Sequence, residues 1–177
     1  WFPTRRGDYV LLEGDEFGKV LMQSPDTVQL RTPGRAIKYY RTTDFMAAMP
    51  VNLSEKGFGL YIHCYLDYRH RYQLTSAIRA VLEKQVRSAL EHEEFGLHLH
   101  KLQVGFSRAE RYALSLGVFA VFSGEAASRY IPIRRSLRQI IFDTCNDNGW
   151  SLAYSELKVN TGQDSLALDE GQALARR

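Results

Sequence analysis

The sequence predicts an α+β fold of two small modules. A small β-barrel-like (Sm-like) domain at residues 1–54 is followed by a ferredoxin-like β-α-β-β-α-β domain at residues 55–160. Short strand-like segments separated by Gly and Pro fill the first part. In the second part, four strand-like segments alternate with two long segments of helical period. Residues 161–177 are polar and have no period, which predicts a disordered tail.

The first module is predicted to contain four strands. The third of them, Thr-Val-Gln-Leu-Arg-Thr, alternates apolar and polar residues as a half-buried strand does. Turns are expected at Gly14, at Pro25 and at Pro33-Gly34, because Pro fixes φ and Gly permits turn conformations. Strands this short are not stable alone, so we expect them to close on each other or on a partner chain. The predicted strands are residues 9–12, 17–23, 27–32 and 35–40.

The second module begins after a predicted linker at residues 50–57. Its first helix should carry one apolar stripe that includes Ile78, Leu82, Val86 and Leu90, spaced as one helix face requires. The remaining elements follow from period-2 segments and from a second helical stripe around Ile133 and Leu137. In chain order we predict a strand over 58–66, a helix over 71–92, strands over 98–106 and 112–122, a helix over 124–148 and a strand over 150–159.

Composition restricts the function classes. The net charge of +3 is low for a dedicated nucleic-acid binder, so no nucleic-acid partner is expected. Cys64 and Cys145 are far apart and form no CxxC motif, so we expect neither a disulfide framework nor a structural zinc site. The same cysteine usage favours a reducing compartment. No apolar run reaches the roughly 18 residues of a membrane helix. Because Trp1 is not an initiator, membrane or targeting segments are expected upstream.

Catalytic and cofactor motifs are absent from the sequence. It contains no P-loop, no GxSxG and no HExxH, so we expect neither an enzyme nor a bound cofactor. The main alternative is a soluble two-module protein that binds RNA or a regulatory small molecule. Small barrels and ferredoxin-like sheets both serve that purpose, and the chain has 10 Tyr and 9 Phe. The predicted strand pair nevertheless lacks the basic-Gly-aromatic sequence of RNA-binding sheets.

Three short segments resemble a known family. Residues 7–10 read Gly-Asp-Tyr-Val, residues 18–20 read Gly-Lys-Val, and residues 27–35 read Thr-Val-Gln-Leu-Arg-Thr-Pro-Gly-Arg. They are similar to the Gly-Asp-x-Val, Gly-x-Val and Thr-x-Leu-Arg-Thr-x-Asp-Gly-Arg motifs in the β-domain of small-conductance mechanosensitive ion channels. The order of elements over residues 58–159 is similar to that of the α/β domain of the same family. The chain thus resembles the cytoplasmic C-terminal portion of these channels.

The resemblance implies a role in osmotic stress. Upstream membrane helices would open an ion pore under tension and release ions and small osmolytes on hypo-osmotic shock. This portion would form a hollow vestibule on the cytoplasmic side of the inner cell membrane, as a homo-oligomer and, by family analogy, a heptamer. The fragment itself is expected to be soluble. A closed ring of identical subunits would also remove exposed sheet edges.

Arginines are the main candidate site residues. Arg129, Arg134, Arg135 and Arg138 form the densest charge cluster, and the residues at 134 and 138 share a helix face. Repeated around a ring, they would raise the anion concentration at a vestibule wall or side opening. The alternative is a solvated helix face paired with nearby acids.

Two further arginines, Arg5 and Arg6, would follow the pore helix, where they could contact phospholipid headgroups.

Other polar motifs favour ordinary structural roles. His98 and His100 would lie on one face of a strand, but no third metal ligand is evident, so no metal is expected. His63 and Cys64 are adjacent in a strand and must point to opposite faces, which excludes a catalytic pair. Cys145, in the apolar-flanked end of a helix, is expected to be packed rather than reactive. Residues 67–71 are expected to form a strand-to-helix turn rather than an opening or a contact with a neighbour.

Overall fold

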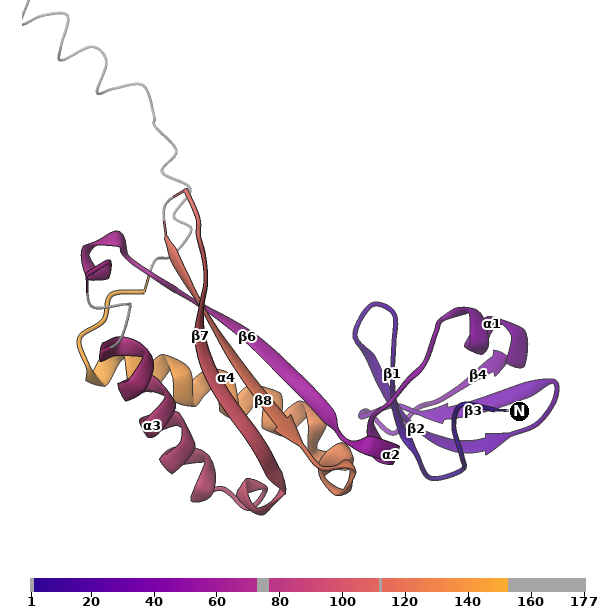
Figure 1. The fold of residues 1–177 in the computed structure, drawn as a ribbon. Helices are drawn as coiled ribbons and strands as arrows, with labels where there is room; N and C mark the ends of the chain where they lie inside the picture. Colours follow the sequence, from indigo (N-terminus) through magenta and orange to yellow (C-terminus); the bar gives the residue numbers. More distant parts are fainter. Residues whose placement is uncertain (1, 73–76, 112, 153–177) are drawn as a thin grey trace, which may run out of the picture.

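The computed structural model describes residues 2–72, 77–111 and 113–152. Figure 1 shows two modules in sequence, each built on its own antiparallel sheet. The architecture is therefore mixed α+β, as predicted. The predicted tail at 161–177 lies outside the described residues.

The first module is a five-stranded sheet with the order β4-β3-β2-β1-β5, in which all neighbours are antiparallel. Alternation places Val10, Val20, Val28 and Leu30 on the inner face, where each is fully buried. The four predicted strands are confirmed, although the fourth begins two residues later than predicted. Their bounds are β1 (Tyr9–Leu12), β2 (Glu16–Gln23), β3 (Thr27–Arg31), β4 (Ile37–Arg41) and β5 (Val51–Asn52).

The prediction of a linker over residues 50–57 was wrong. This segment contains β5, which pairs with β1, and the short helix α2 (Leu53–Lys56). The Asn52 side chain caps α2 by accepting hydrogen bonds from the backbone N–H groups of Ser54 and Glu55. A further unpredicted helix, α1 (Thr42–Ala47), places Phe45 in the core of the first sheet.

The second module is a three-stranded antiparallel sheet with the order β6-β8-β7. Its strands are β6 (Phe58–Leu66), β7 (Leu99–Ala109) and β8 (Leu114–Phe122). The three predicted strands are thus confirmed, but β7 continues through residues 107–109, which were predicted to be a connection. Leu152 forms an antiparallel bridge with Leu66 of β6. Of the strand predicted over 150–159, residues 150 and 151 are not in a strand, and residues 153–159 lie outside the described residues.

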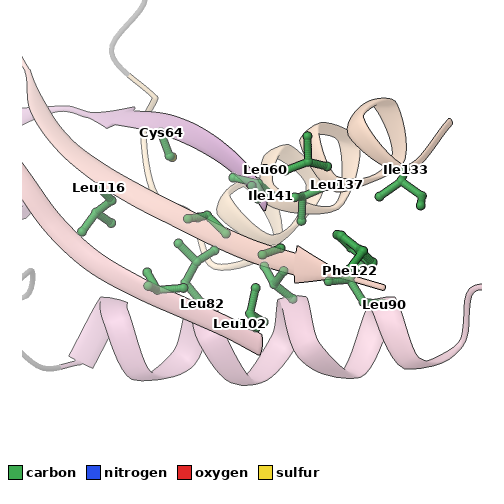
Figure 2. Packing of buried hydrophobic residues seen from close by; sticks show 14 of the residues in the cluster. Leu60, Cys64, Leu82, Leu90, Leu102, Leu116, Phe122, Ile133, Leu137 and Ile141 are labelled. Carbon is green, nitrogen blue, oxygen red and sulfur yellow. The ribbon is translucent and has the colours of Figure 1, made fainter. Parts of the chain in front are cut away.

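Two long helices pack against this sheet, and Figure 2 shows the buried side chains between them. They are α3 (Ala77–Glu91) and α4 (Tyr130–Asp147). The predicted stripe of α3 is confirmed, because Ile78, Leu82, Val86 and Leu90 are all at most 1% exposed. The segment Gly124–Arg129, predicted as the start of the second helix, is instead a 3-10 helix that precedes α4. Two further 3-10 turns, Tyr68–His70 and Gly96–His98, flank α3.

Aromatic side chains join the two modules. Phe17 of β2 stacks on Tyr9 at 5.7 Å and on Tyr130 of α4 at 5.5 Å between ring centroids, and it belongs to the core cluster of the second module. Leu53 of α2 belongs to the same cluster. The backbone N–H of Tyr9 also donates to Ser54 Oγ at 2.9 Å. The first sheet is therefore fixed to the second module by buried apolar contacts.

Among the described residues, no helix combines the length and the apolar character needed to cross a membrane.

Candidate functional site: a basic groove between the two modules

A groove of about 1240 Å³ lies where the first sheet faces α4. Residues of β1, β2, β3 and β4 and of the turn between β3 and β4 form one wall. The other wall is formed by the 3-10 segment Gly124–Arg129 and the first half of α4. Its apolar surface includes Phe17, Ile131 and Pro132. The groove exists because the ring of Phe17 stacks on Tyr130 at the junction and holds the two walls in place.

Four cationic side chains line this groove: Lys19, Arg31, Arg35 and Arg135. Among the described residues that line it, none is acidic. Lys19 and Arg31 lie directly opposite each other on β2 and β3, an arrangement of like charges that destabilises a sheet unless it is compensated. The Nζ of Lys19 lies 5.3 Å from the centre of the Tyr9 ring, which offsets part of that repulsion. The groove therefore carries a positive potential and suits anions.

The arginine cluster at the start of α4 divides into two kinds of residue. Arg129 forms an ion pair with Glu94. Arg134 pairs with Asp15 Oδ2 at 3.1 Å, and its guanidinium lies 5.4 Å from the centre of the Tyr130 ring. Both charges are therefore opposed by an acid, and Arg134 serves to link α4 to the first sheet.

Arg135 and Arg138 differ from these two. Both side chains are exposed, and Arg135 lines the groove. Within the part of the chain that the structure describes, neither of them forms an ion pair with an acid, so their charges are opposed mainly by dissolved salt.

Arg5 and Arg6 lie just before β1, and both are exposed. The backbone N–H of Arg5 donates to Asp8 Oδ2 at 2.8 Å. Arg6 lines a second hollow of about 640 Å³ together with Lys19 and Arg31. Because Lys19 and Arg31 line both this hollow and the groove, a continuous basic band runs from Arg6 to the groove.

Sequence reasoning missed Lys19, Arg31 and Arg35. They are 12 and 4 positions apart along the chain (31 − 19 and 35 − 31), so no local charge run marks them. The signal was the hairpin itself: antiparallel pairing of the second and third predicted strands brings Lys19 opposite Arg31.

The structure separates the predicted pair of histidines, His98 and His100. His98 ends a 3-10 turn before β7, so the prediction that it shares a strand face with His100 was wrong. Its Nδ1 lies 3.2 Å from Ser123 Oγ and 3.5 Å from Glu125 Oε2. Within the part of the chain that the structure describes, no three His, Cys, Asp or Glu side chains gather as metal ligands would.

The remaining candidate motifs have structural roles. His63 lies on the outer face of β6, with Nδ1 3.1 Å from Ser115 Oγ, whereas Cys64 is buried on the inner face. Asp67 accepts from the backbone N–H of Arg69 at 2.9 Å and thereby begins the 3-10 turn. This hydrogen bond, aided by the Arg69 guanidinium, lowers the pKa of Asp67. Residues 67–71 thus contain the strand-to-helix turn that the sequence predicted.

Comparison with known proteins gives a likeness in structure alone. No family model matches the sequence, and no curated protein matches it either. The match to MscS of Helicobacter pylori in its closed state covers 89% of this chain and 58% of the MscS chain, with a TM-score of 0.61 and 14% identity. The match to wild-type MSL1 of Arabidopsis thaliana covers 86% of this chain and 52% of the MSL1 chain, with a TM-score of 0.58 and 13% identity.

At these identities the likeness shows the fold. This chain spans a little more than half the length of the solved structures it matches. It carries the α+β fold that is found in channels of the MscS family.

Proposed function

We propose that this chain is the cytoplasmic vestibule portion of a tension-gated mechanosensitive channel that releases ions and small osmolytes on hypo-osmotic shock. The observation that carries the proposal is the match to MscS over 89% of the chain, which takes in both modules and their order. The motifs at residues 7–10, 18–20 and 27–35 also support it, because they fall at the entry to β1, within β2, and on β3 with the turn that follows it, in the order that the family resemblance implies.

The finer description of the fold belongs to the same proposal. We take the five-stranded antiparallel sheet as Sm-like and the second module as ferredoxin-like. The order β6-β8-β7, with Leu152 bridged to the free side of β6, corresponds to the 4-1-3-2 arrangement of a split β-α-β unit.

Assembly into a ring fits the edges of the first sheet. Within the described residues, β4 and β5 are its outer strands, and they expose Ile37 at 45%, Tyr39 at 67% and Val51 at 56%. Exposed apolar edge strands favour association, and identical subunits that pair head to tail close into a ring without free edges. We therefore propose a homo-oligomer, a heptamer by analogy, held to the membrane through an upstream segment.

In such a ring, Arg135 and Arg138 would raise the anion concentration beside the permeation path.

The full-length protein, expressed in cells that lack tension-gated channels, should give suction-activated currents in membrane patches and should protect the cells against hypo-osmotic shock. The absence of both effects in correctly inserted protein would overturn the proposed function.

The charge-reversal variant R135E/R138E should shift the reversal potential toward cation preference. The matched control is Lys84→Glu, an exposed charge on α3. An equal shift in both variants, or none in either, would remove the permeation role of these arginines.

One observation favours a second candidate, the RNA-binding module. The outer face of the second sheet presents Tyr61, His63 and Tyr65 in a row on β6, with ring centroids 4.8 Å and 6.0 Å apart, and Phe119 beside Tyr61. Aromatic rings on an uncovered sheet are a platform for stacking bases. Binding of labelled single-stranded RNA that Tyr61→Ala weakens would support this candidate, and unchanged fluorescence anisotropy would exclude it.

A further inference from the structure

The structure brings together the two cysteines of the chain. Cys64 on β6 and Cys145 on α4 are 81 residues apart in sequence, but their Sγ atoms lie 3.5 Å from each other. Figure 2 shows Cys64 on the helix-facing side of the sheet. Both side chains are buried, at 4% and 0% exposure, and both are free thiols. Within these 177 residues there are two cysteines, so any thiol chemistry of this portion belongs to this pair.

The contact is polar as well as close. A thiol–thiol hydrogen bond links the two sulfur atoms. Either sulfur atom can be the donor of this bond. A thiolate on one cysteine is therefore stabilised by a hydrogen bond from the thiol of the other.

The location of the pair allows the sulfur atoms to move. Cys145 lies two residues before the end of α4, and Cys64 lies two residues before the end of β6. A disulfide requires an S–S distance of about 2.05 Å, so the sulfur atoms must approach by roughly 1.5 Å. Side-chain rotation and a small shift at the ends of two elements can supply this, since helix and strand ends are less constrained than their centres.

We propose that Cys64 and Cys145 form an oxidation site that closes to an intramolecular disulfide when the protein meets a peroxide. The thiolate of one cysteine attacks a peroxide oxygen, the O–O bond breaks, and the sulfur becomes a sulfenic acid while hydroxide leaves and takes up a proton as water. The sulfur of the other cysteine then attacks the sulfenic sulfur, the S–O bond breaks, and a second water leaves with the proton of that second thiol. Two thiols are oxidised, and one hydrogen peroxide is reduced to two waters.

In a reducing compartment the pair stays reduced at rest, and the disulfide forms only under oxidant. Its consequence is mechanical, because the covalent link joins the end of the first strand of the second module to the end of its last described helix. It does not depend on the proposed channel function.

The test is hydrogen peroxide treatment of the folded 177-residue chain, followed by intact-mass measurement and thiol titration in denaturant. We expect the loss of the mass of two hydrogens, a fall from two thiols to none, no covalent dimer on a non-reducing gel, and full reversal by dithiothreitol. The midpoint of thermal unfolding should rise by about 5 to 10 °C in the oxidised protein. Oxygen adducts, linked dimers or an unchanged thiol count would each overturn the proposal.

Single variants test the intermediate. In Cys64→Ser and in Cys145→Ser the remaining cysteine should stop at a sulfenic acid that a cyclic dione captures. No captured sulfenic acid in either variant would overturn the proposed route. If either variant fails to fold, a peptide map of the oxidised wild type decides the main proposal through the presence or absence of a Cys64–Cys145 cross-linked peptide.

Discussion

Glu16 is the centre of a small polar network on the first sheet. Its Oε1 accepts from Tyr40 Oη at 2.7 Å and lies 2.7 Å from Lys38 Nζ. The hydrogen bonds from Lys38 and Tyr40 lower the pKa of Glu16, and burial together with the bond to Glu16 raises the pKa of Tyr40 to about 12. The ionised carboxylate therefore stabilises the contact between β2 and β4, which are separated by β3 in the sheet.

We expect Glu16→Gln to lower the free energy of unfolding by about 1 to 2 kcal/mol at pH 7, somewhat below the value of a buried hydrogen bond to a charged group, because the side chains of Glu16 and Lys38 are partly exposed. Because the pKa of Glu16 is depressed in the folded state, its contribution is present above 4.5 and is lost as the pH falls below that value. The difference between wild type and variant in urea denaturation should therefore shrink at low pH. Glu13→Gln, an exposed neighbour, is the control, and an equal loss in both variants would contradict the role of the network.

Tyr40 titrates at the opposite end of the pH range. Its pKa is raised in the folded state, so its contribution is present below pH 10 and is lost as the pH rises toward about 12. In Tyr40→Phe, the loss of stability between pH 10 and 12, followed by circular dichroism, should be smaller than in the wild type. A wild-type loss in this range that Tyr40→Phe leaves unchanged would exclude Tyr40 as its source.

At the level of single residues, some side-chain orientations and contacts could be predicted from the sequence and others could not. The opposite orientation of His63 and Cys64 follows from strand geometry, and the structure confirms it. The approach of Cys64 to Cys145 does not follow from any local pattern, because it requires the docking of a helix on a strand 81 residues away. Likewise, the acids that oppose Arg129 and Arg134 come from distant segments.

At the level of elements, long periodic segments were predictable and short ones were not. The strand Phe58–Leu66 has the bounds that its alternation predicted, because nine residues establish a period. The helix α2 has only four residues, too few for a helical stripe. Its one local signal was a cap, since Asn52 precedes Glu55 by three positions, as in a capping box. The 3-10 segment Gly124–Arg129 was missed because its Ala residues suit either kind of helix.

Gly124 tests the contact between α2 and this 3-10 segment. A Cβ at this position would lie 1.9 Å from the backbone carbonyl oxygen of Ser54, which no side-chain motion can relieve. We expect Gly124→Ala to lower the free energy of unfolding by about 1 to 3 kcal/mol, as overpacking does. Gly105→Ala on β7 is the matched control, because a Cβ there meets nothing within 4 Å. Urea denaturation measures the free energy of unfolding of both variants. An equal change in the two would show that the backbone around Gly124 can shift at no cost in stability.

At the level of the whole molecule, the two modules share buried residues. The first sheet has its own core around Phe45, but Phe17 of β2 packs in the core of the second module. The sequence predicted most strands and the two long helices in their order, since alternation and helical period mark them. It could not predict the shared packing. In the sequence Phe17 looks like any apolar residue of a strand, and its contact with Tyr130 requires that both modules are folded.

This shared packing predicts cooperative unfolding. Calorimetry of the wild type should show one transition, with a calorimetric enthalpy equal to the van't Hoff enthalpy. Phe45→Leu weakens only the first core, yet it should lower the midpoint of that single transition, because neither module unfolds alone. Phe17→Ala removes the ring between the modules and should separate the transition into two.

Independent modules would give the opposite pattern. The wild type would then show two transitions, Phe45→Leu would move only one of them, and Phe17→Ala would leave their number unchanged. One cooperative unit is also what the proposed vestibule wall would require. A displacement applied to the first sheet is transmitted to the second module through the contacts between them, so the packing of Phe17 on Tyr130 must resist deformation about as strongly as the core of each module does.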